Sequence, residues 1–147
     1  MTDHAVSTGR KVPIWFWTIA VLAVLWNFGG VYDYVMTQTS EAYLEGFTPE
    51  QVAFFTGFPA WYVAIWASAV FAVFFASLAL LLRLKLAFAL FAVSLLLFGV
   101  NTIHIYGFTP AAEMMGAAGS VFNAAIFLSL IALTGLSLWA IKAEILR

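Results

Sequence analysis

The amino-acid sequence predicts an all-α membrane protein, a bundle of four transmembrane helices with a short-helix loop on one side of the membrane. The first observation is composition: 65% of the residues are hydrophobic and 9% are charged, whereas soluble domains carry about 25% charge. The second is a set of four apolar runs, at 13–35, 60–82, 86–106 and 117–141. The third is that all six Lys and Arg residues fall on one side of this pattern.

Each apolar run is long enough to cross a bilayer, because about 20 apolar residues span the ~30 Å hydrocarbon layer as a helix. Backbone polar groups find no water there, so helices are the expected spans. Residues 1–12 are predicted to form a cytoplasmic tail, and 13–147 a single transmembrane domain. Pro13 suits the first turn of the first span. That span is longer than the apolar core of a signal peptide, so we expect it to be retained.

The basic residues predict the orientation of the chain, because Lys and Arg in short flanks are retained in the cytoplasm. We therefore expect both termini in the cytoplasm. The links 36–59 and 107–116 then face outward, to the periplasm for a bacterial inner-membrane protein. The acidic residues in or beside these links are Asp33, Glu41, Glu45, Glu50 and Glu113. The basic residues on the opposite side are Arg10, Lys11, Arg83, Lys85, Lys142 and Arg147.

The outer loop 36–59 is too long to be structureless in a compact bundle, and it carries its own helix signals. Ser40 can cap a helical turn over the residues that follow it. Thr48-Pro49-Glu50-Gln51 has the pattern of a capping box with a proline in the first turn. We expect one or two short helices here, lying over the mouth of the bundle or on the membrane surface.

Small residues repeat at every fourth position of the second span. In lipid, helices associate through close packing rather than through a hydrophobic force, and small side chains permit close approach. The second span is therefore predicted to be central, in contact with a neighbouring helix of this chain or of a second copy. The predicted partners are the lipid bilayer and either further copies of the chain or a larger membrane complex. The ladder consists of Ala60, Ala64, Ser68, Ala72 and Ala76.

Polar groups inside spans are the default functional candidates, because each costs free energy unless it has a partner. Here they lie in the outer parts of the first, third and fourth spans, where the helices can bring them to similar depth. One interpretation is a pocket for a small polar or cationic solute, with Asp33 supplying charge and His104 a proton switch. In the other, Asp33 is interfacial, His104 pairs with it or with a tyrosine, and the asparagines join helices. The candidates are Asn27, Asp33, Asn101, His104 and Asn123.

Several function classes fit the sequence poorly. With no cysteine in the chain, disulfides, thiolate metal sites and cysteine nucleophiles are excluded. His104, Asp33 and Glu113 make a thin ligand set, so no metal and no cofactor is expected. No Ser, His and acid sit at a recognisable catalytic turn. A net charge of −1 argues against nucleic acid, and the inner half of the spans has few ionisable groups for ion-coupled transport.

The segment Trp26-Asn27-Phe28-Gly29-Gly30-Val31-Tyr32-Asp33-Tyr34-Val35-Met36-Thr37-Gln38-Thr39 resembles a family of small, uncharacterised bacterial four-span inner-membrane proteins. The resemblance continues through Glu-Ala-Tyr at 41–43 and Phe-Pro-Ala-Trp at 58–61. Some members carry an automatic "sugar transporter" label, and the family brings no catalytic residues. The resemblance implies that Trp26, Asn27, Asp33, Tyr34 and Pro59 belong to one outer-side element, which adds Tyr34 to the candidate ligand-binding residues.

The leading functional prediction is a non-enzymatic inner-membrane protein that binds or moves a small solute through an outer-side polar pocket, alone or as an oligomer. One alternative is an accessory or assembly subunit that packs against a larger membrane complex, for which the small-residue ladder would face outward. Another is a membrane enzyme acting on a lipid-soluble substrate. A hollow lined by the candidate polar residues would favour the first prediction, and close packing of those residues against one another would contradict it.

Overall fold

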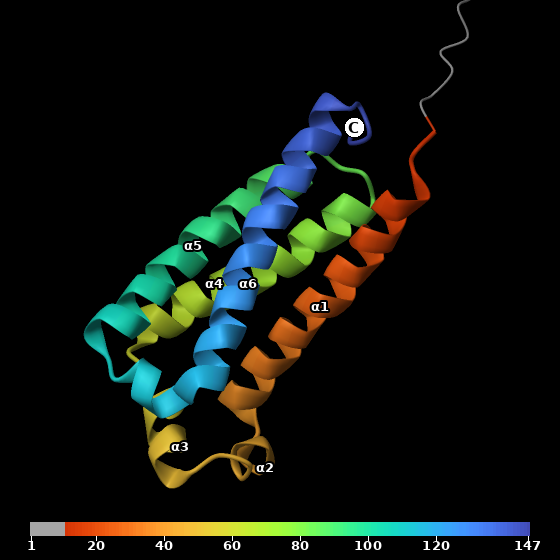
Figure 1. Ribbon diagram of the computed structural model, residues 1–147. Helices are drawn as coiled ribbons and strands as arrows, with labels where there is room; N and C mark the ends of the chain where they lie inside the picture. Colours follow the sequence, from red (N-terminus) through yellow and green to blue (C-terminus); the bar gives the residue numbers. More distant parts are fainter. Residues whose placement is uncertain (1–10) are drawn as a thin grey trace, which may run out of the picture.

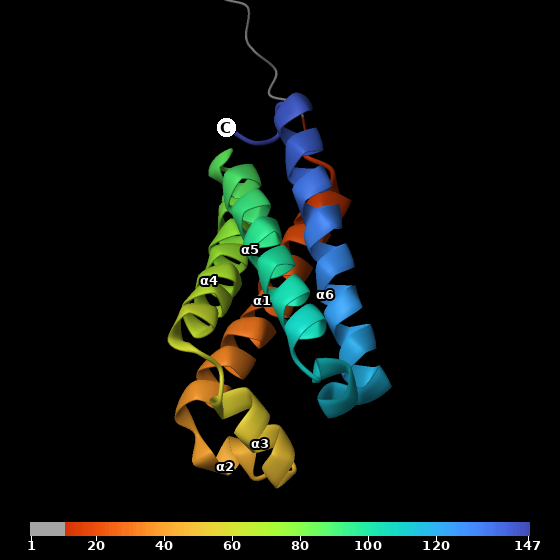
Figure 2. The same cartoon turned by 90° about the vertical axis from the view of Figure 1, so that its left-hand side faces the viewer.

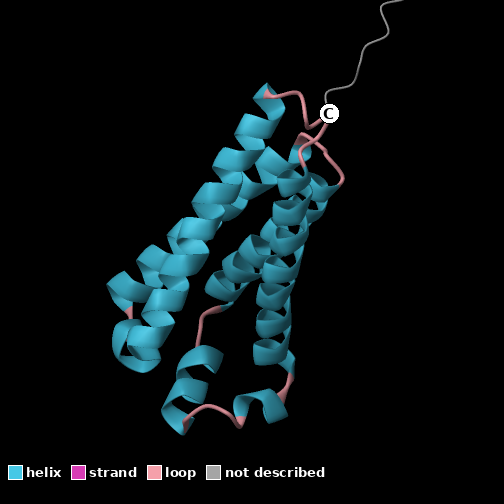
Figure 3. Ribbon diagram, turned by 45° about the vertical axis from the view of Figure 1, so that its right-hand side comes forward, coloured by secondary structure: helices cyan, strands magenta, loops and turns pink. Residues whose placement is uncertain are grey.

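The computed structural model describes residues 11–147, and this part of the chain is helical without strands (Figure 3). Four helices are long and apolar enough to cross a membrane. They are α1 (Ile14–Thr39), α4 (Ala60–Leu81), α5 (Leu86–Phe108) and α6 (Ala111–Lys142). Two short helices, α2 (Glu41–Leu44) and α3 (Pro49–Thr56), lie between α1 and α4. Arg10 and most of the predicted cytoplasmic tail lie outside the described residues.

The observed helices follow the predicted spans, with differences at their ends. α1 continues to Thr39 rather than ending near residue 35, and α5 continues to Phe108. α6 begins at Ala111, but Gly116 interrupts it with φ 63° and ψ −170°. That conformation is almost exclusive to glycine, so residues 111–115 form a separate turn, and the long part of α6 starts after Gly116, where the fourth apolar run was predicted to begin.

The four long helices form a bundle in which α4 is central. α4 packs against both α1 and α5, and α6 packs mainly against α5. α2 and α3 lie together at one end of the bundle, opposite the end that holds the carboxyl terminus (Figure 1). We call residues 40–58 the lid, the end beneath them the lid end, and the opposite end the basic end. α1 and α6 diverge toward the lid end (Figure 2).

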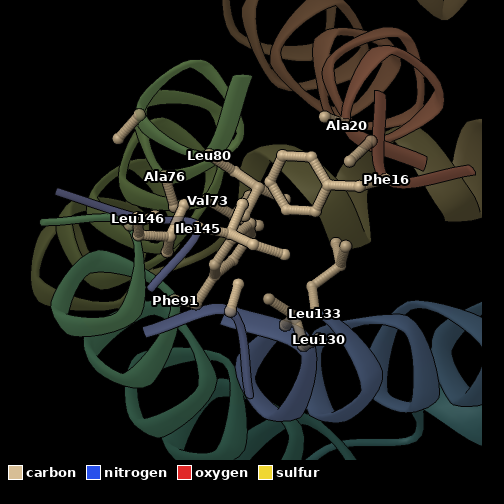
Figure 4. Packing of buried hydrophobic residues seen from close by; sticks show 14 residues of the cluster. Phe16, Ala20, Val73, Ala76, Leu80, Phe91, Leu130, Leu133, Ile145 and Leu146 are labelled. Atoms are coloured by element: carbon tan, nitrogen blue, oxygen red, sulfur yellow. The ribbon is translucent and has the colours of Figure 1, made fainter. Parts of the chain in front are cut away.

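The apolar core lies toward the basic end (Figure 4). Phe16 of α1, Leu80 of α4 and Phe91 of α5 are completely buried there, together with Ala20 and Ala76. Large rings fill the interior, and the alanines allow the helix backbones to approach closely. α1, α4, α5 and α6 all contribute to this cluster, so the basic end is the closed end of the bundle.

The small-residue ladder of α4 does not lie along one packed face. Ala60, Ala64 and Ser68 are exposed, Ala72 is half-buried, and only Ala76 is fully buried. An α-helix has 3.6 residues per turn, so every fourth residue advances about 40° around the axis, and a five-member ladder winds across the helix. The buried residues of α4 follow an irregular spacing instead and are Tyr62, Ala69, Val73, Ala76, Ser77, Ala79 and Leu80.

Main-chain hydrogen bonds join the α4–α5 link to the chain's last residues at the basic end. The Arg147 N–H donates to the Arg83 carbonyl (2.7 Å), and the Lys85 N–H donates to the Arg147 carbonyl (3.0 Å). The Arg83 guanidinium Nε also donates to the Ile145 carbonyl at 2.8 Å. Three basic residues therefore share one end of the bundle, while the acidic side chains of the lid and of Glu113 lie at the other.

Candidate functional site

The lid folds through the capping groups that its sequence contains. The Ser40 hydroxyl oxygen accepts from the Tyr43 N–H at 3.2 Å, which starts α2. At α3, the Thr48 hydroxyl oxygen accepts from the Gln51 N–H (3.3 Å), and the Gln51 side-chain oxygen accepts from the Thr48 N–H (3.1 Å). This is the capping box that the sequence predicts, and it satisfies donors that a helix start otherwise leaves free.

Two side-chain hydrogen bonds join the lid to the long helices. The Tyr43 hydroxyl donates to Asp33 Oδ1 of α1 at 2.7 Å. The Gln51 amide Nε2 donates to the Met114 carbonyl in the first turn of α6 at 3.0 Å. The lid thus bridges α1 and α6, the two helices that diverge beneath it.

The pKa of the Tyr43 phenol is raised from 10.0 to about 12, chiefly because its hydroxyl donates to the Asp33 carboxylate. Because the pKa of Tyr43 is raised, the stabilisation from this hydrogen bond is fully present below pH 10 and is lost as the pH rises through about 12. We expect Asp33→Asn to return the Tyr43 pKa toward 10.0. NMR titration of labelled tyrosine rings, assigned with Tyr43→Phe, measures it. An unchanged Tyr43 pKa in Asp33→Asn would contradict the hydrogen bond.

A hollow of about 330 Å³ lies beneath the lid, and we call it the lid hollow. Its wall comes from the lid and from all four long helices, with aromatic rings including Phe55, Phe58, Trp66 and Phe98. Mostly apolar pockets of ~300–1,000 Å³ with a few convergent polar groups are typical of small-molecule sites. The polar groups here are Asp33, Thr37, Gln51, Asn101, Thr102 and Asn123.

A second hollow, of about 370 Å³, lies further into the bundle between α1, α4, α5 and α6. We call it the bundle hollow. It shares wall residues with the lid hollow, namely Asp33, Trp66, Phe98, Phe122 and Ile126. The two hollows are therefore neighbours, separated by side chains that face both of them.

Asn101 is the most distinctive polar residue of the lid hollow. Its side chain is only 5% exposed, and its Oδ1 has no hydrogen-bond partner among the described residues. The adjacent Thr102 hydroxyl is also buried without a partner there. A buried polar group left unsatisfied costs about 1–3 kcal/mol. Because Asn101 lines the hollow, a rotation of its side chain would bring this oxygen to a ligand that supplies the missing partner.

Asn27 has a structural role in addition to its place on the wall of the bundle hollow. Its amide Nδ2 donates to the Ser77 hydroxyl of α4 (2.8 Å) and to the Ala23 carbonyl of its own helix (2.9 Å). Ser94 of α5 similarly donates to the Ala69 carbonyl of α4 at 2.8 Å. The two polar side chains of the inner part of the bundle hollow are thus engaged in joining helices.

Tyr34 and His104, two of the six candidates, line neither hollow. The Tyr34 ring contacts the Trp66 ring at a centroid distance of 5.0 Å. The His104 ring lies against Trp61 at 4.7 Å and Tyr62 at 5.2 Å. Both side chains therefore pack on α4. The structure brings Asp33, Asn101 and Asn123 together around the lid hollow, and Asn27 and Asp33 around the bundle hollow.

The loop was expected over the mouth of the bundle, but the aromatic wall of the lid hollow and the contact from Gln51 to α6 were not predicted. Gln51 was interpreted only as a capping residue, and Phe98 and Phe122 were not singled out within the spans. A usable signal was present in the spacing of Phe98 and Asn101 on α5, because residues three or four apart lie on the same side of a helix.

Within residues 11–147, no group of three or more His, Cys, Asp and Glu side chains is placed to hold a metal ion. The fold and its four apolar helices are those of a multi-pass integral membrane protein. Comparison with protein-family models, curated proteins and solved structures finds no match to this chain. The two hollows and the residues that line them are therefore the features that indicate a function.

Proposed function

We propose that this protein is a non-enzymatic membrane protein that binds a small polar or cationic solute in the lid hollow. The observation that carries the proposal is Asn101, a buried amide with an unpartnered oxygen in the wall of that hollow. Asn123 adds a further amide to the same wall, whereas the Gln51 amide is engaged with Thr48 and Met114. Amides and hydroxyls can orient a ligand by hydrogen bonds, whereas general acid–base chemistry normally needs paired titratable groups.

The charge of the lining favours a cation over an anion. Asp33 lies on the walls of both hollows, and no Lys, Arg or His of the described chain lines either. Aromatic faces such as those of Trp66 and Phe58 attract cations through their ring electrons. One oxygen of Asp33 accepts from Tyr43, which leaves Oδ2 for a bound ammonium group.

The proposal places the protein in a bacterial inner membrane with the basic end in the cytoplasm. Lys85, Arg83 and Arg147 support this orientation because basic residues in short flanks are retained there. The lid would then face the periplasm, and the solute would enter the hollow from that side.

Binding of benzylammonium, whose N–H groups can donate to the Asn101 oxygen, to the protein in lipid nanodiscs tests the proposal. We expect Asp33→Asn and Asn101→Leu each to weaken binding by about tenfold, the factor for ~1.4 kcal/mol. Glu45→Gln is the matched control, because it removes an acid of the same lid end that lines neither hollow. Benzenesulfonate is the matched anion and should bind more weakly. Equal affinity of the wild type and Asn101→Leu for the cation would refute the site.

An accessory subunit of a larger complex, or of a homo-oligomer, is the second candidate. The observation that favours it is the exposed small-residue stretch of α4, formed by Ala60, Ala64 and Ser68. Small residues on an exposed face permit close approach of another helix. Sedimentation of the protein and of Ala64→Leu in detergent tests this candidate, because a leucine at such an interface would shift the protein toward the monomer.

A further inference from the structure

We infer that the ligand is an amphipathic organic cation, which enters sideways from the bilayer between α1 and α6. Its charged head occupies the lid hollow and its alkyl chain the bundle hollow. This inference rests on the proposed function and names the chemical class of its ligand. It follows from the different chemistry of the two adjoining hollows, from the side on which exposed aromatic side chains cover the bundle hollow, and from the charge of the lining.

The two hollows divide the polar and apolar parts of such a ligand between them. The lid hollow has Asn101 and Thr102, whose buried oxygens have no partner among the described residues. The bundle hollow has Asn27 and Ser94, whose side chains already donate to α4. Unpartnered hydrogen-bonding groups therefore lie at the lid end, whereas the wall of the deeper bundle hollow is mainly apolar. A molecule with one polar end and one apolar end matches this arrangement.

The bundle hollow is covered on its side between α1 and α6 by two exposed aromatic side chains. Its wall includes Trp26 of α1 and Phe122 of α6, whose ring centroids lie 5.8 Å apart. These side chains are 43% and 56% exposed, on helices whose outer faces meet lipid. α1 and α6 therefore meet beside the hollow through these two rings. A ligand that enters from the side would pass next to them.

Two glycines of α1 keep the wall beside this entry free. Gly29 and Gly30 line the bundle hollow, and a Cβ atom added at either would meet nothing within 4 Å. Neither glycine is needed for close helix packing, and neither has a positive φ. Their small size leaves room for an apolar chain to pass along α1.

Toward the basic end the space between α1 and α6 is closed. Trp15 and Trp139 lie with their ring centroids 5.2 Å apart, and the buried core around Phe16 fills the interior. A chain entering from the side therefore ends within the bundle. This geometry describes a site that holds an amphipath within one half of the membrane.

The charge of the lining selects the head group. Asp33 lies on the wall shared by the two hollows, where the head of a ligand would meet its chain. Its carboxylate would meet an ammonium head among the rings of Trp66 and Phe98 and would repel a sulfate or phosphate. Amphipaths with anionic heads are therefore poor ligands, even when their chains are identical.

The test uses dodecylammonium and the protein in nanodiscs, with empty nanodiscs to measure partitioning into lipid. Gly30→Leu adds a side chain to the wall of the bundle hollow, and Gly29→Leu is a second variant of the same design. Gly135→Leu is the matched control, because a Cβ atom added there also meets nothing within 4 Å and Gly135 lines neither hollow. Dodecyl sulfate is the anion of equal chain length.

We expect Gly30→Leu to weaken binding of dodecylammonium by about tenfold, with Gly135→Leu unchanged and dodecyl sulfate bound more weakly by the wild type. Benzylammonium, which lacks the chain, should bind Gly30→Leu as it binds the wild type. If it binds and both Gly29→Leu and Gly30→Leu leave the long-chain affinity unchanged, the inference about the chain is overturned while the proposed function stands. If benzylammonium does not bind at all, the proposed function fails as well.

Discussion

Replacing Phe91 by alanine is expected to lower the free energy of unfolding by about 2–3 kcal/mol. The Phe91 ring is completely buried in the core cluster between α4, α5 and α6. In a membrane the unfolded helix keeps this ring in lipid, which is as apolar as the core. The transfer term is therefore small, and the loss comes from the cavity. At about 24 cal/mol per Å³, a cavity of roughly 100 Å³ costs about 2.4 kcal/mol.

Phe75→Ala is the matched control for this prediction, because the Phe75 side chain is 53% exposed on the outer face of α4. Lipid can fill the space that its ring leaves, so its unfolding free energy should change by less than about 0.5 kcal/mol. Equilibrium unfolding in mixed micelles measures both variants. Equal losses for Phe91→Ala and Phe75→Ala would show that the core at the basic end is not closely packed.

Ala76→Leu is expected to lower the free energy of unfolding by about 1–3 kcal/mol, because it adds bulk where none fits. Ala76 is completely buried in α4, in the same cluster as Ala20 of α1. A leucine there forces neighbouring helices apart. Like the cavity term, and unlike the transfer term, this strain does not depend on whether water or lipid surrounds the unfolded chain.

Ala64→Leu, three turns earlier on the same helix, distinguishes packing within one chain from packing between chains. Ala64 is exposed, so its replacement should leave the stability of the monomer nearly unchanged. A loss equal to that of Ala76→Leu, measured at a concentration where the protein is monomeric, would contradict the placement of Ala64. A change confined to the oligomeric state would support the accessory-subunit candidate instead.

The fold could be predicted well from the sequence because a bilayer imposes few alternatives. Apolar runs of sufficient length must become helices, and four such helices are present. The capping box at Thr48 and Gln51 was also visible, since it depends on residues three apart. The end of α1 at Thr39 could not be predicted, because no proline or glycine stands at this position. Its last turn is followed by Ser40, whose backbone is extended.

The site could be predicted only in part. The sequence indicates how deep in the membrane a residue lies, but it does not indicate which way the residue faces around the helix axis. Asn101, Asp33 and Asn123 were expected at similar depth, and the structure places them on one hollow. His104 lies one turn from Asn101 yet faces Trp61 of α4. Which of two neighbouring residues faces inward is decided by how the helices pack, and this depends on side chains far apart in the chain.

The contact between Trp26 and Phe122 has a consequence for how often the bundle opens. A pair of aromatic rings at this distance contributes about 0.5–1.5 kcal/mol. The polar contacts that join α4 to α1 and to α5 run from Asn27 to Ser77 and from Ser94 to Ala69, so parting these two rings leaves both hydrogen bonds intact. A free-energy difference of about 1.4 kcal/mol corresponds to roughly one open molecule for every ten closed. For the proposed amphipathic ligand, such an entry would be populated before binding, and the rate of capture would follow the amount of amphipath dissolved in the surrounding lipid.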